Sequence, residues 1–262
     1  MYELTSIAFS HYVEKARWAL DRFAVPYRDQ RYLPVLHFGA VYGVHRGQHG
    51  RADKASTRFS TPVLKTPTGQ LLCDSAEIVR YVSDHFAAEG QDLYPSPEIA
   101  PLERQLHDAL GPHTRRCAYG VLFDDPPLLR ELVRRNVDRL QAGVFNLARP
   151  LVVAAMRRGL RVSDAQVERS IAKVRREMQA ISERLADGRP YLVGTRFSAA
   201  DLAFACMAAP VVFPAEYSAW LPPPESLPAT ARELCTELRA TPAGAHALRM
   251  FREERRRVLR AA

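Results

Sequence analysis

The sequence predicts a chain of two domains, an α/β domain followed by an all-helical domain. Residues 1–86 alternate between strand-like and helix-like patterns, whereas apolar residues beyond residue 100 recur at helical spacing. Residues 87–99, which contain glycine and prolines, indicate a linker. The 262 residues are long for one core and suit two domains of ordinary size, here 1–86 and 100–262.

The first domain opens with a β-α-β pattern. Residues 2–7 are apolar and β-prone, and residues 27–33 alternate as a second strand. Between them, apolar residues follow helical spacing up to Pro26: Val13, Ala16, Leu20 and Phe23. A helix between two strands allows the strands to pair in parallel.

A hairpin and a helix complete this domain. Residues 62–65 and 70–73 are short apolar runs joined by the turn sequence Thr-Pro-Thr-Gly, and a helix follows up to Phe86. The intervening segment 34–60 is predicted as an irregular loop rich in basic side chains, and a loop of this length is usually functional or disordered. The order is therefore β-α-β-loop-β-β-α.

The second domain is predicted as a series of helices. One apolar stripe covers 99–110, and a second starts at Pro126 and runs to Leu140. The clearest helix covers 163–186, where apolar residues recur at alternating steps of four and three, and Ser163 with Gln166 predicts a capping box. Further helices are expected over 199–212 and 241–259.

Composition limits the classes of function. Hydrophobic residues make up 47% and charged residues 25%, which is typical of a globular protein. No segment reaches the roughly 18 apolar residues of a membrane span, and no secretion signal is recognisable, so a cytoplasmic location is expected. The four cysteines lack metal-ligand spacing, which predicts reduced thiols and no metal site. The net charge of +8 comes without a nucleic-acid recognition motif.

One local constellation predicts a peptide-binding site. Thr61 and Pro62 stand at the start of a predicted strand, where a cis peptide bond turns the backbone sharply and leaves the N–H and C=O groups of Val63 free. Such groups pair with an extended peptide as another strand does. Asp74 and Ser75 precede a helix, Ser75 is placed to cap it, and the amides there attract a carboxylate.

This pattern resembles the glutathione-binding site of cytosolic glutathione transferases, of the bacterial type with a serine-like active site. The resemblance implies a thioredoxin-like β-α-β-α-β-β-α domain followed by a helical bundle. It also implies glutathione as co-substrate, with Pro62 preceding the residue that pairs with the cysteinyl backbone, and Asp74 and Ser75 at the γ-glutamyl end. The segment 194–201 resembles the family's second capping box, in which Ser198 caps a helix and Asp201 reaches back to the Ser198 amide.

The resemblance places the glutathione sulfur at the start of the first helix. Ser10 occupies the position of the family's activating serine, although His11 replaces the usual proline. A hydroxyl there stabilises the thiolate by donating a hydrogen bond, and Tyr12 is the second candidate for this role. The alternative is that Ser10 only caps the helix and Tyr12 only packs.

The remaining contacts are predicted less specifically. The glycyl carboxylate is expected to bind a basic residue of the 34–60 loop, for which the candidates are His49, Lys54 and Arg58. The acceptor pocket is expected between the domains, and its candidate residues are His11, Arg115, Tyr119 and Phe123.

These observations lead to a hypothesis of function. The thiolate of glutathione attacks an apolar electrophile in a homodimeric detoxification enzyme. The alternatives are a ligand-binding protein that has lost this chemistry, or a glutathione-dependent lyase, isomerase or dehalogenase. Binding of nucleic acid by the basic loop and the 252–260 tail is a further alternative that no motif supports.

Overall fold

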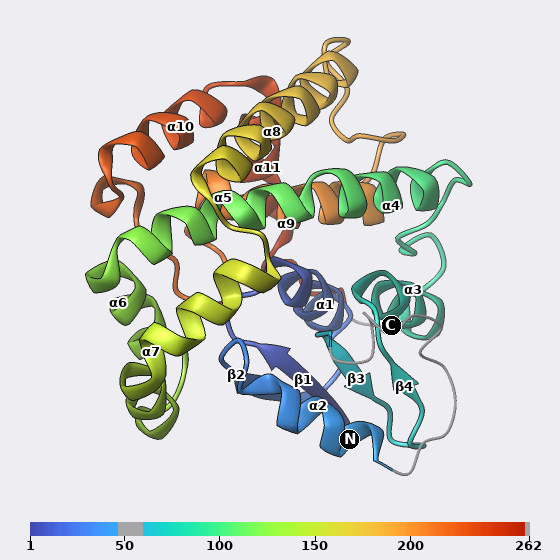
Figure 1. The fold of residues 1–262 in the computed structure, drawn as a ribbon. Helices are drawn as coiled ribbons and strands as arrows, with labels where there is room; N and C mark the ends of the chain where they lie inside the picture. Colours follow the sequence, from blue (N-terminus) through green and yellow to red (C-terminus); the bar gives the residue numbers. More distant parts are fainter. Residues whose placement is uncertain (47–59, 260–262) are drawn as a thin grey trace.

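The computed structural model describes residues 1–46 and 60–259 and has a small sheet in its first part and helices in the rest (Figure 1). The first part runs β1 (Tyr2–Ile7), α1 (His11–Arg22), β2 (Tyr27–Tyr32), α2 (His37–His45), β3 (Val63–Lys65), β4 (Leu71–Leu72) and α3 (Ser75–Phe86). This order confirms the thioredoxin-like β-α-β-α-β-β-α domain. The segment 34–60 was predicted as an irregular loop, and this prediction is wrong for residues 37–45, which form helix α2.

The sheet has the strand order β2-β1-β3-β4. β1 and β2 are parallel, as the helix between them requires, and β3 is antiparallel to both β1 and β4. Leu4 of β1 pairs with Leu64 of β3, and both side chains are fully buried. The hairpin predicted after Pro62 therefore forms the second half of the sheet.

The helical part contains eight α-helices among the described residues and a short 3-10 turn (Figure 1). They are α4 (Ile99–Ala109), α5 (Gly111–Asp124), α6 (Pro126–Asn136), α7 (Arg139–Gly159), α8 (Asp164–Arg184), α9 (Ala199–Val212), η1 (Pro224–Ser226), α10 (Ala229–Arg239) and α11 (Pro242–Glu254).

Helix α9 is the centre of this part. Every residue of α9 except Pro210 is buried, and α4, α5, α11 and α1 all pack against it. α1 also packs on α3 and lies between the sheet and the helical part (Figure 1). The two halves are therefore joined through α1, whose N-terminus carries the candidate serine.

Several predicted helix limits are wrong for local reasons. The stripe expected from Pro126 to Leu140 is two helices, because Val137 leaves the helical conformation and the side chain of Asp138 caps α7 through the Gln141 amide. The last helix ends at Glu254 rather than residue 259. α10 had no prediction. α8 begins at Asp164 with Ser163 as N-cap, but the Ser163 side chain makes no capping bond within the described chain, so the predicted capping box is wrong.

The second capping box is confirmed. Asp201 accepts a hydrogen bond from the Ser198 amide at 3.1 Å, and its other oxygen accepts from the Leu192 amide at 2.8 Å. His246 of α11 lies 3.0 Å from the same carboxylate. Asp201 is fully buried, so this carboxylate holds α9, the loop before it and α11 together.

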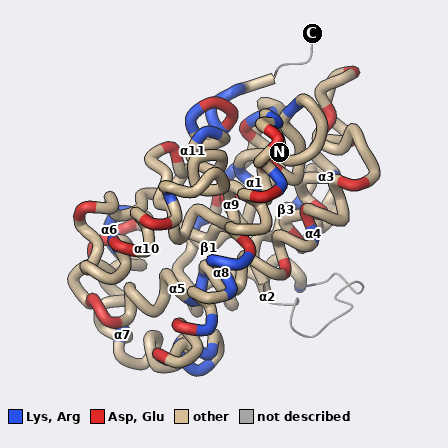
Figure 2. The backbone as a smooth tube through the Cα atoms, turned by 90° about the horizontal axis from the view of Figure 1, so that it is seen from above, with Lys and Arg blue, Asp and Glu red and all other residues tan. Residues whose placement is uncertain are grey.

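The charged side chains are spread over the surface in both signs. Figure 2 shows basic and acidic residues side by side at the end of α11, where Arg255 is buried in ion pairs rather than exposed. The four cysteines are free thiols, and the described residues contain no cluster that could hold a metal ion. Among the described helices, none combines the length and the apolar character that a membrane crossing needs.

Candidate functional site

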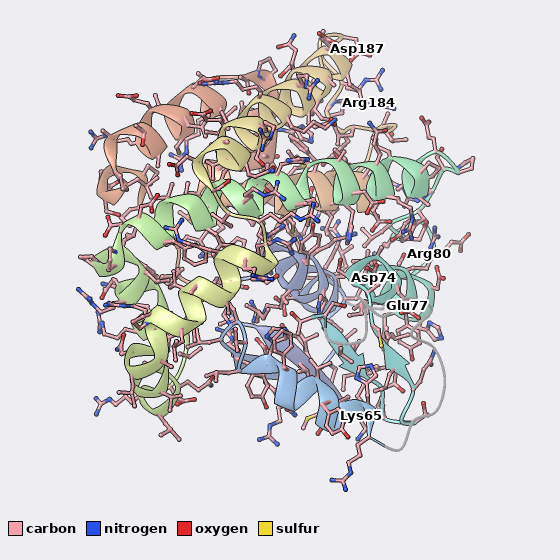
Figure 3. The ribbon with its side chains drawn as sticks, in the orientation of Figure 1. Lys65, Asp74, Glu77, Arg80, Arg184 and Asp187 are labelled. Atoms are coloured by element: carbon pink, nitrogen blue, oxygen red, sulfur yellow. The ribbon has the colours of Figure 1, made fainter. Side chains whose placement is uncertain are left out.

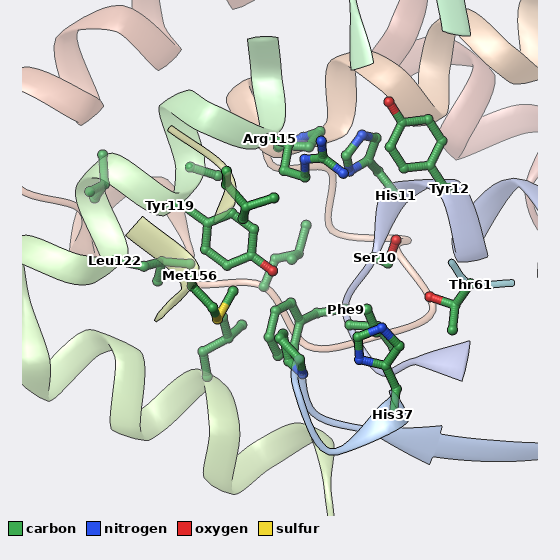
Figure 4. Close-up of a pocket in the computed structure, with 18 of the residues that line it drawn as sticks. Phe9, Ser10, His11, Tyr12, His37, Thr61, Arg115, Tyr119, Leu122 and Met156 are labelled. Atoms are coloured by element: carbon green, nitrogen blue, oxygen red, sulfur yellow. The ribbon is translucent and has the colours of Figure 1, made fainter. Parts of the chain in front are cut away.

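A cavity of about 480 Å³ lies between the two halves, at the N-terminus of α1. Its walls come from the loop after β1, the segment around α2, α5, α7 and the chain after α9 (Figure 4). Ser10, His11, Tyr12, Arg115 and Tyr119 all line it, so the structure brings these five candidates together. Most of the remaining wall is apolar.

Ser10 faces this cavity from the N-cap position of α1. Its backbone is extended, with φ −74° and ψ 129°, and its carbonyl accepts the first helical bond from the Glu14 amide at 2.9 Å. Its hydroxyl makes no capping bond to the helix as described. The alternative that Ser10 serves only as a cap is therefore not supported, because the hydroxyl is available to a ligand in the cavity (Figure 4).

Tyr12 is held at the junction of the two halves. Its hydroxyl donates to the His107 carbonyl at 3.4 Å, and its ring lies 4.7 Å from the His107 ring, centre to centre. Burial raises the pKa of Tyr12 to about 12. Its hydroxyl points away from Ser10 in Figure 4. The Tyr12 hydroxyl is thus bonded to α4, whereas the Ser10 hydroxyl faces the cavity.

His11 is a buried neutral side chain. Its Nε2 lies 3.1 Å from the Gly111 carbonyl, and since a carbonyl only accepts, Nε2 carries the proton. Burial and the nearby Arg115 hold the pKa of His11 well below its usual value. The residue that replaces the usual proline thus fastens the start of α1 to the start of α5.

The cis-proline prediction is confirmed, since the Thr61–Pro62 peptide bond is cis and β3 begins at Val63. Val63 is 1% exposed, pairs with Thr5 in the sheet and lies outside the cavity lining. Thr61 lines the cavity beside Ser10 (Figure 4). The backbone at Thr61, one residue before the cis-proline, is therefore the nearer one to a ligand in the cavity.

Asp74 lies at the start of α3 (Figure 3), and Asp74 rather than the predicted Ser75 caps this helix. Asp74 is the N-cap and accepts from the Ala76 amide at 2.8 Å, because the helix starts at Ser75, one residue earlier than a Ser75 cap requires. Ser75 is 1% exposed, and its Oγ has no hydrogen-bond partner among the described residues. A buried hydroxyl without a partner is costly unless a ligand completes it.

Asp74 is connected to the start of α1 by a short series of side chains. Its carboxylate lies 3.9 Å from Nε2 of His107, and the His107 ring packs on Tyr12. Burial lowers the pKa of His107, and Lys15 lowers it further. The predicted ends of the glutathione site are thus joined through His107 and Tyr12, which belong to different halves.

The candidates for the glycyl carboxylate, His49, Lys54 and Arg58, lie outside the described residues. Their role stays a prediction from the sequence.

The acceptor candidates divide into two groups. Arg115 and Tyr119 line the cavity from one face of α5, and burial raises the pKa of Tyr119 to about 12. Phe123 lies behind Tyr119, with the two rings stacked at 5.2 Å, and outside the cavity lining. The guanidinium of Arg157 lies 5.3 Å from the Phe123 ring, so α7 covers the face of Phe123 that would otherwise be open.

Several lining residues had no signal in the sequence. Val35 and Phe213 both have positive φ, 74° and 46°, which is rare for bulky side chains and concentrates at functional sites. Tyr217 donates a hydrogen bond to the Phe9 carbonyl at 3.3 Å, across 208 residues of chain. Such contacts join segments whose meeting no local pattern indicates.

Comparison with solved structures identifies the class of fold. A glutathione S-transferase from Pseudomonas fluorescens superimposes with a TM-score of 0.56 at 15% identity, covering 98% of both chains. The beta-etherase LigF from Sphingobium sp. strain SYK-6 gives 0.55 at 18% identity, covering 95% of this chain and 98% of that one. A glutathione S-transferase from Methylobacillus flagellatus, solved with glutathione bound, gives 0.51 at 17%, covering 94% and 98%. At these identities the likeness shows the fold.

Two family models match the sequence itself. Residues 4–90 match the N-terminal domain of glutathione S-transferases, and residues 164–232 match the C-terminal domain. The chain belongs to the glutathione S-transferase family. Among curated proteins, none has a significant match to this sequence.

Proposed function

We propose that this protein binds glutathione and transfers its thiolate to an apolar electrophile in the cavity. The observation that carries the proposal is the Ser10 hydroxyl, which faces the cavity at the N-terminus of α1 without capping the helix. Its hydrogen bond and the helix dipole both favour the thiolate over the thiol. The thiolate forms the C–S bond with the acceptor, and the leaving group departs or the proton is taken from solvent.

The proposed glutathione lies along three contacts. Its sulfur lies at Ser10, its cysteinyl backbone pairs along 61–63, and its γ-glutamyl group lies at Asp74 and Ser75. The unpartnered Ser75 hydroxyl supports the last contact, because a carboxylate at the start of α3 completes it. The apolar cavity beside Ser10 supports an apolar acceptor.

The Ser75→Ala variant tests the glutathione site by calorimetric titration with reduced glutathione. We expect an affinity about 10- to 100-fold lower, since a hydrogen bond to a charged group contributes about 1.5–3 kcal/mol. The free energy of unfolding should not fall, because Ser75 Oγ has no hydrogen-bond partner to lose within residues 1–46 and 60–259.

Ser83→Ala is the matched control on the same helix. Ser83 is also buried, but its Oγ accepts from the Leu93 amide at 2.9 Å. This variant should lose about 1 kcal/mol of stability and keep its glutathione affinity. Equal glutathione affinity in wild type and Ser75→Ala would reject the site at α3.

A glutathione-dependent lyase is the second candidate. It is favoured by the likeness to the beta-etherase LigF, which superimposes as well as the transferases do. Both activities begin with the same thiolate, so they differ in the bond that breaks. Analysis of the products from a panel of ethers, halides and activated arenes separates them. Glutathione binding without any product would favour the ligand-binding alternative.

We also propose that the protein is a homodimer, as the sequence resemblance implies. Leu140, Leu147 and Leu151 of α7 are 78%, 88% and 78% exposed, and self-association would shield them. Sedimentation equilibrium should give twice the 29.5 kDa chain mass, and Leu147→Asp should reduce that mass toward the monomer. A monomeric wild type would contradict the proposal. The cytoplasmic location and the role in detoxification stay predictions.

A further inference from the structure

The described part of the cavity wall contains one permanent charge. Among the described residues that line it, Arg115 is the only one with a side chain that is fully charged at neutral pH, since no lysine, aspartate, glutamate or other arginine lines it. The lining also contains His11, whose pKa is held well below its usual value by burial and by Arg115 itself. Arg115 is therefore a permanent cation in a described wall that is mostly apolar.

Arg115 differs from the deeply buried cations of this protein. Lys15 pairs with Glu103 at 2.6 Å, Arg17 with Asp29 at 3.0 Å, and Arg22 with Glu254 at 2.9 Å. Arg115 is partly buried and has no carboxylate or hydrogen-bond partner among the described residues. Its only ring contact there is with Tyr12, whose centre lies 5.8 Å from the guanidinium carbon. A guanidinium withdrawn from water is costly unless an anion or solvent meets its donors.

The position of Arg115 on α5 defines how an anionic ligand would be oriented in the cavity. Arg115 follows Gly111, which holds His11, by one turn, and Tyr119 and Leu122 follow on the same face. The cation therefore lies at the end of the wall nearest the start of α1, and the apolar surface extends away from it toward Met156 (Figure 4). A ligand that fills this wall has a charged head at Arg115 and an apolar body beyond it.

We propose that the acceptor carries an anionic group, a carboxylate above all, which Arg115 binds, and that its apolar body lies against Tyr119, Leu122 and Met156. The planar guanidinium fits a carboxylate through two parallel N–H···O bonds. The proposal rests on the proposed function, because it names the class of substrate for the same site. It makes Arg115 a residue that selects the acceptor rather than one that activates the thiol.

The test compares two ligands with the same apolar body, 4-phenylbutyrate and 4-phenylbutanamide, by calorimetric titration of the full-length protein. We expect wild type to prefer the acid by about tenfold or more, from the energy of a charge-assisted hydrogen bond. Arg115→Met should abolish this preference and keep the affinity for the amide. Arg115→Lys should restore part of the preference, since the charge remains and the fork is lost.

The control variant is Arg176→Met, which removes the same charge from an exposed position on α8. It should keep the wild-type preference, which excludes a general effect of net charge. An equal affinity of wild type for acid and amide would overturn the proposal, as would an unchanged preference in Arg115→Met.

Glutathione titration separates this proposal from the proposed function. Glutathione affinity should be the same in wild type and Arg115→Met, and a large loss would assign Arg115 to glutathione and overturn the acceptor role. A wild type that prefers the acid but binds no glutathione would retain the anion site and reject the transferase.

Discussion

Replacing Ser10 with alanine should lower turnover by about 10- to 100-fold at neutral pH, because the pKa of the bound thiol then returns toward about 8.5 from a value one to two units lower. Glutathione affinity should change little, since the proposed contacts of the peptide lie mainly at 61–63 and at the start of α3. The measurement is kcat against pH with an electrophile that wild type conjugates, beside a calorimetric glutathione titration.

The lowered thiol pKa also predicts the direction in which the pH profile of kcat shifts in the variant. A lowered thiol pKa keeps the wild-type rate high at pH values below 8, where the unassisted thiol is protonated. The Ser10→Ala profile should therefore rise at higher pH than the wild-type profile, and the two should approach one another above about pH 9.

Tyr12→Phe separates the two candidate hydroxyls. The Tyr12 hydroxyl is bonded to the His107 carbonyl and points away from Ser10 (Figure 4). Its removal should leave the pH profile in place. If the pH profile of kcat shifts in Tyr12→Phe and is unchanged in Ser10→Ala, Tyr12 and not Ser10 is the residue that activates the thiol.

The largest effect on stability is expected at Glu14, which joins α1 to the end of α11. Glu14 is fully buried, accepts from Arg255 Nε at 2.6 Å and is also hydrogen-bonded by Ser218. Arg255 also pairs with Asp21 at 2.9 Å. Glu14→Ala leaves the buried guanidinium with one partly exposed partner, so we expect a loss of about 3–5 kcal/mol in urea denaturation.

Two comparisons make this result specific. The double variant Glu14→Met with Arg255→Met should recover part of the loss, because neither buried charge is then left alone. Arg175→Met breaks the exposed pair with Glu237 on α8 and α10 and should cost about 0–1 kcal/mol. A similar small loss in Glu14→Ala would show that water reaches the interior pair.

The predictions that held depend on short-range pattern. The buried stripe of α8, the cis bond before Pro62 and the Ser198–Asp201 capping box each involve residues within a few turns of one another. Steric and hydrogen-bond rules of this range act in the same way wherever the segment lies. They were therefore visible before the tertiary structure.

Two of the predictions that failed concern choices between neighbouring residues. Asp74 and Ser75 are both good N-caps, and the start of α3 decides which of them caps. Tyr119 and Phe123 are four residues apart on α5, and the position of α7 decides which of them the cavity receives. The local sequence pattern suits both members of each pair about equally, so it does not decide between them.

The sequence by itself indicated an α/β part followed by a helical part, most of the order of their elements and the cis bond before Pro62, because apolar periodicity and turn chemistry carry that information. The resemblance to the family added Ser10 and Asp74 as candidate site residues. Only the tertiary structure decided that Glu14 and Arg255 form a buried pair 241 residues apart. It also decided that Arg115 is the single permanent charge in the described wall of the cavity. Burial and charge pairing depend on which distant segments meet, and that is a property of the packed chain.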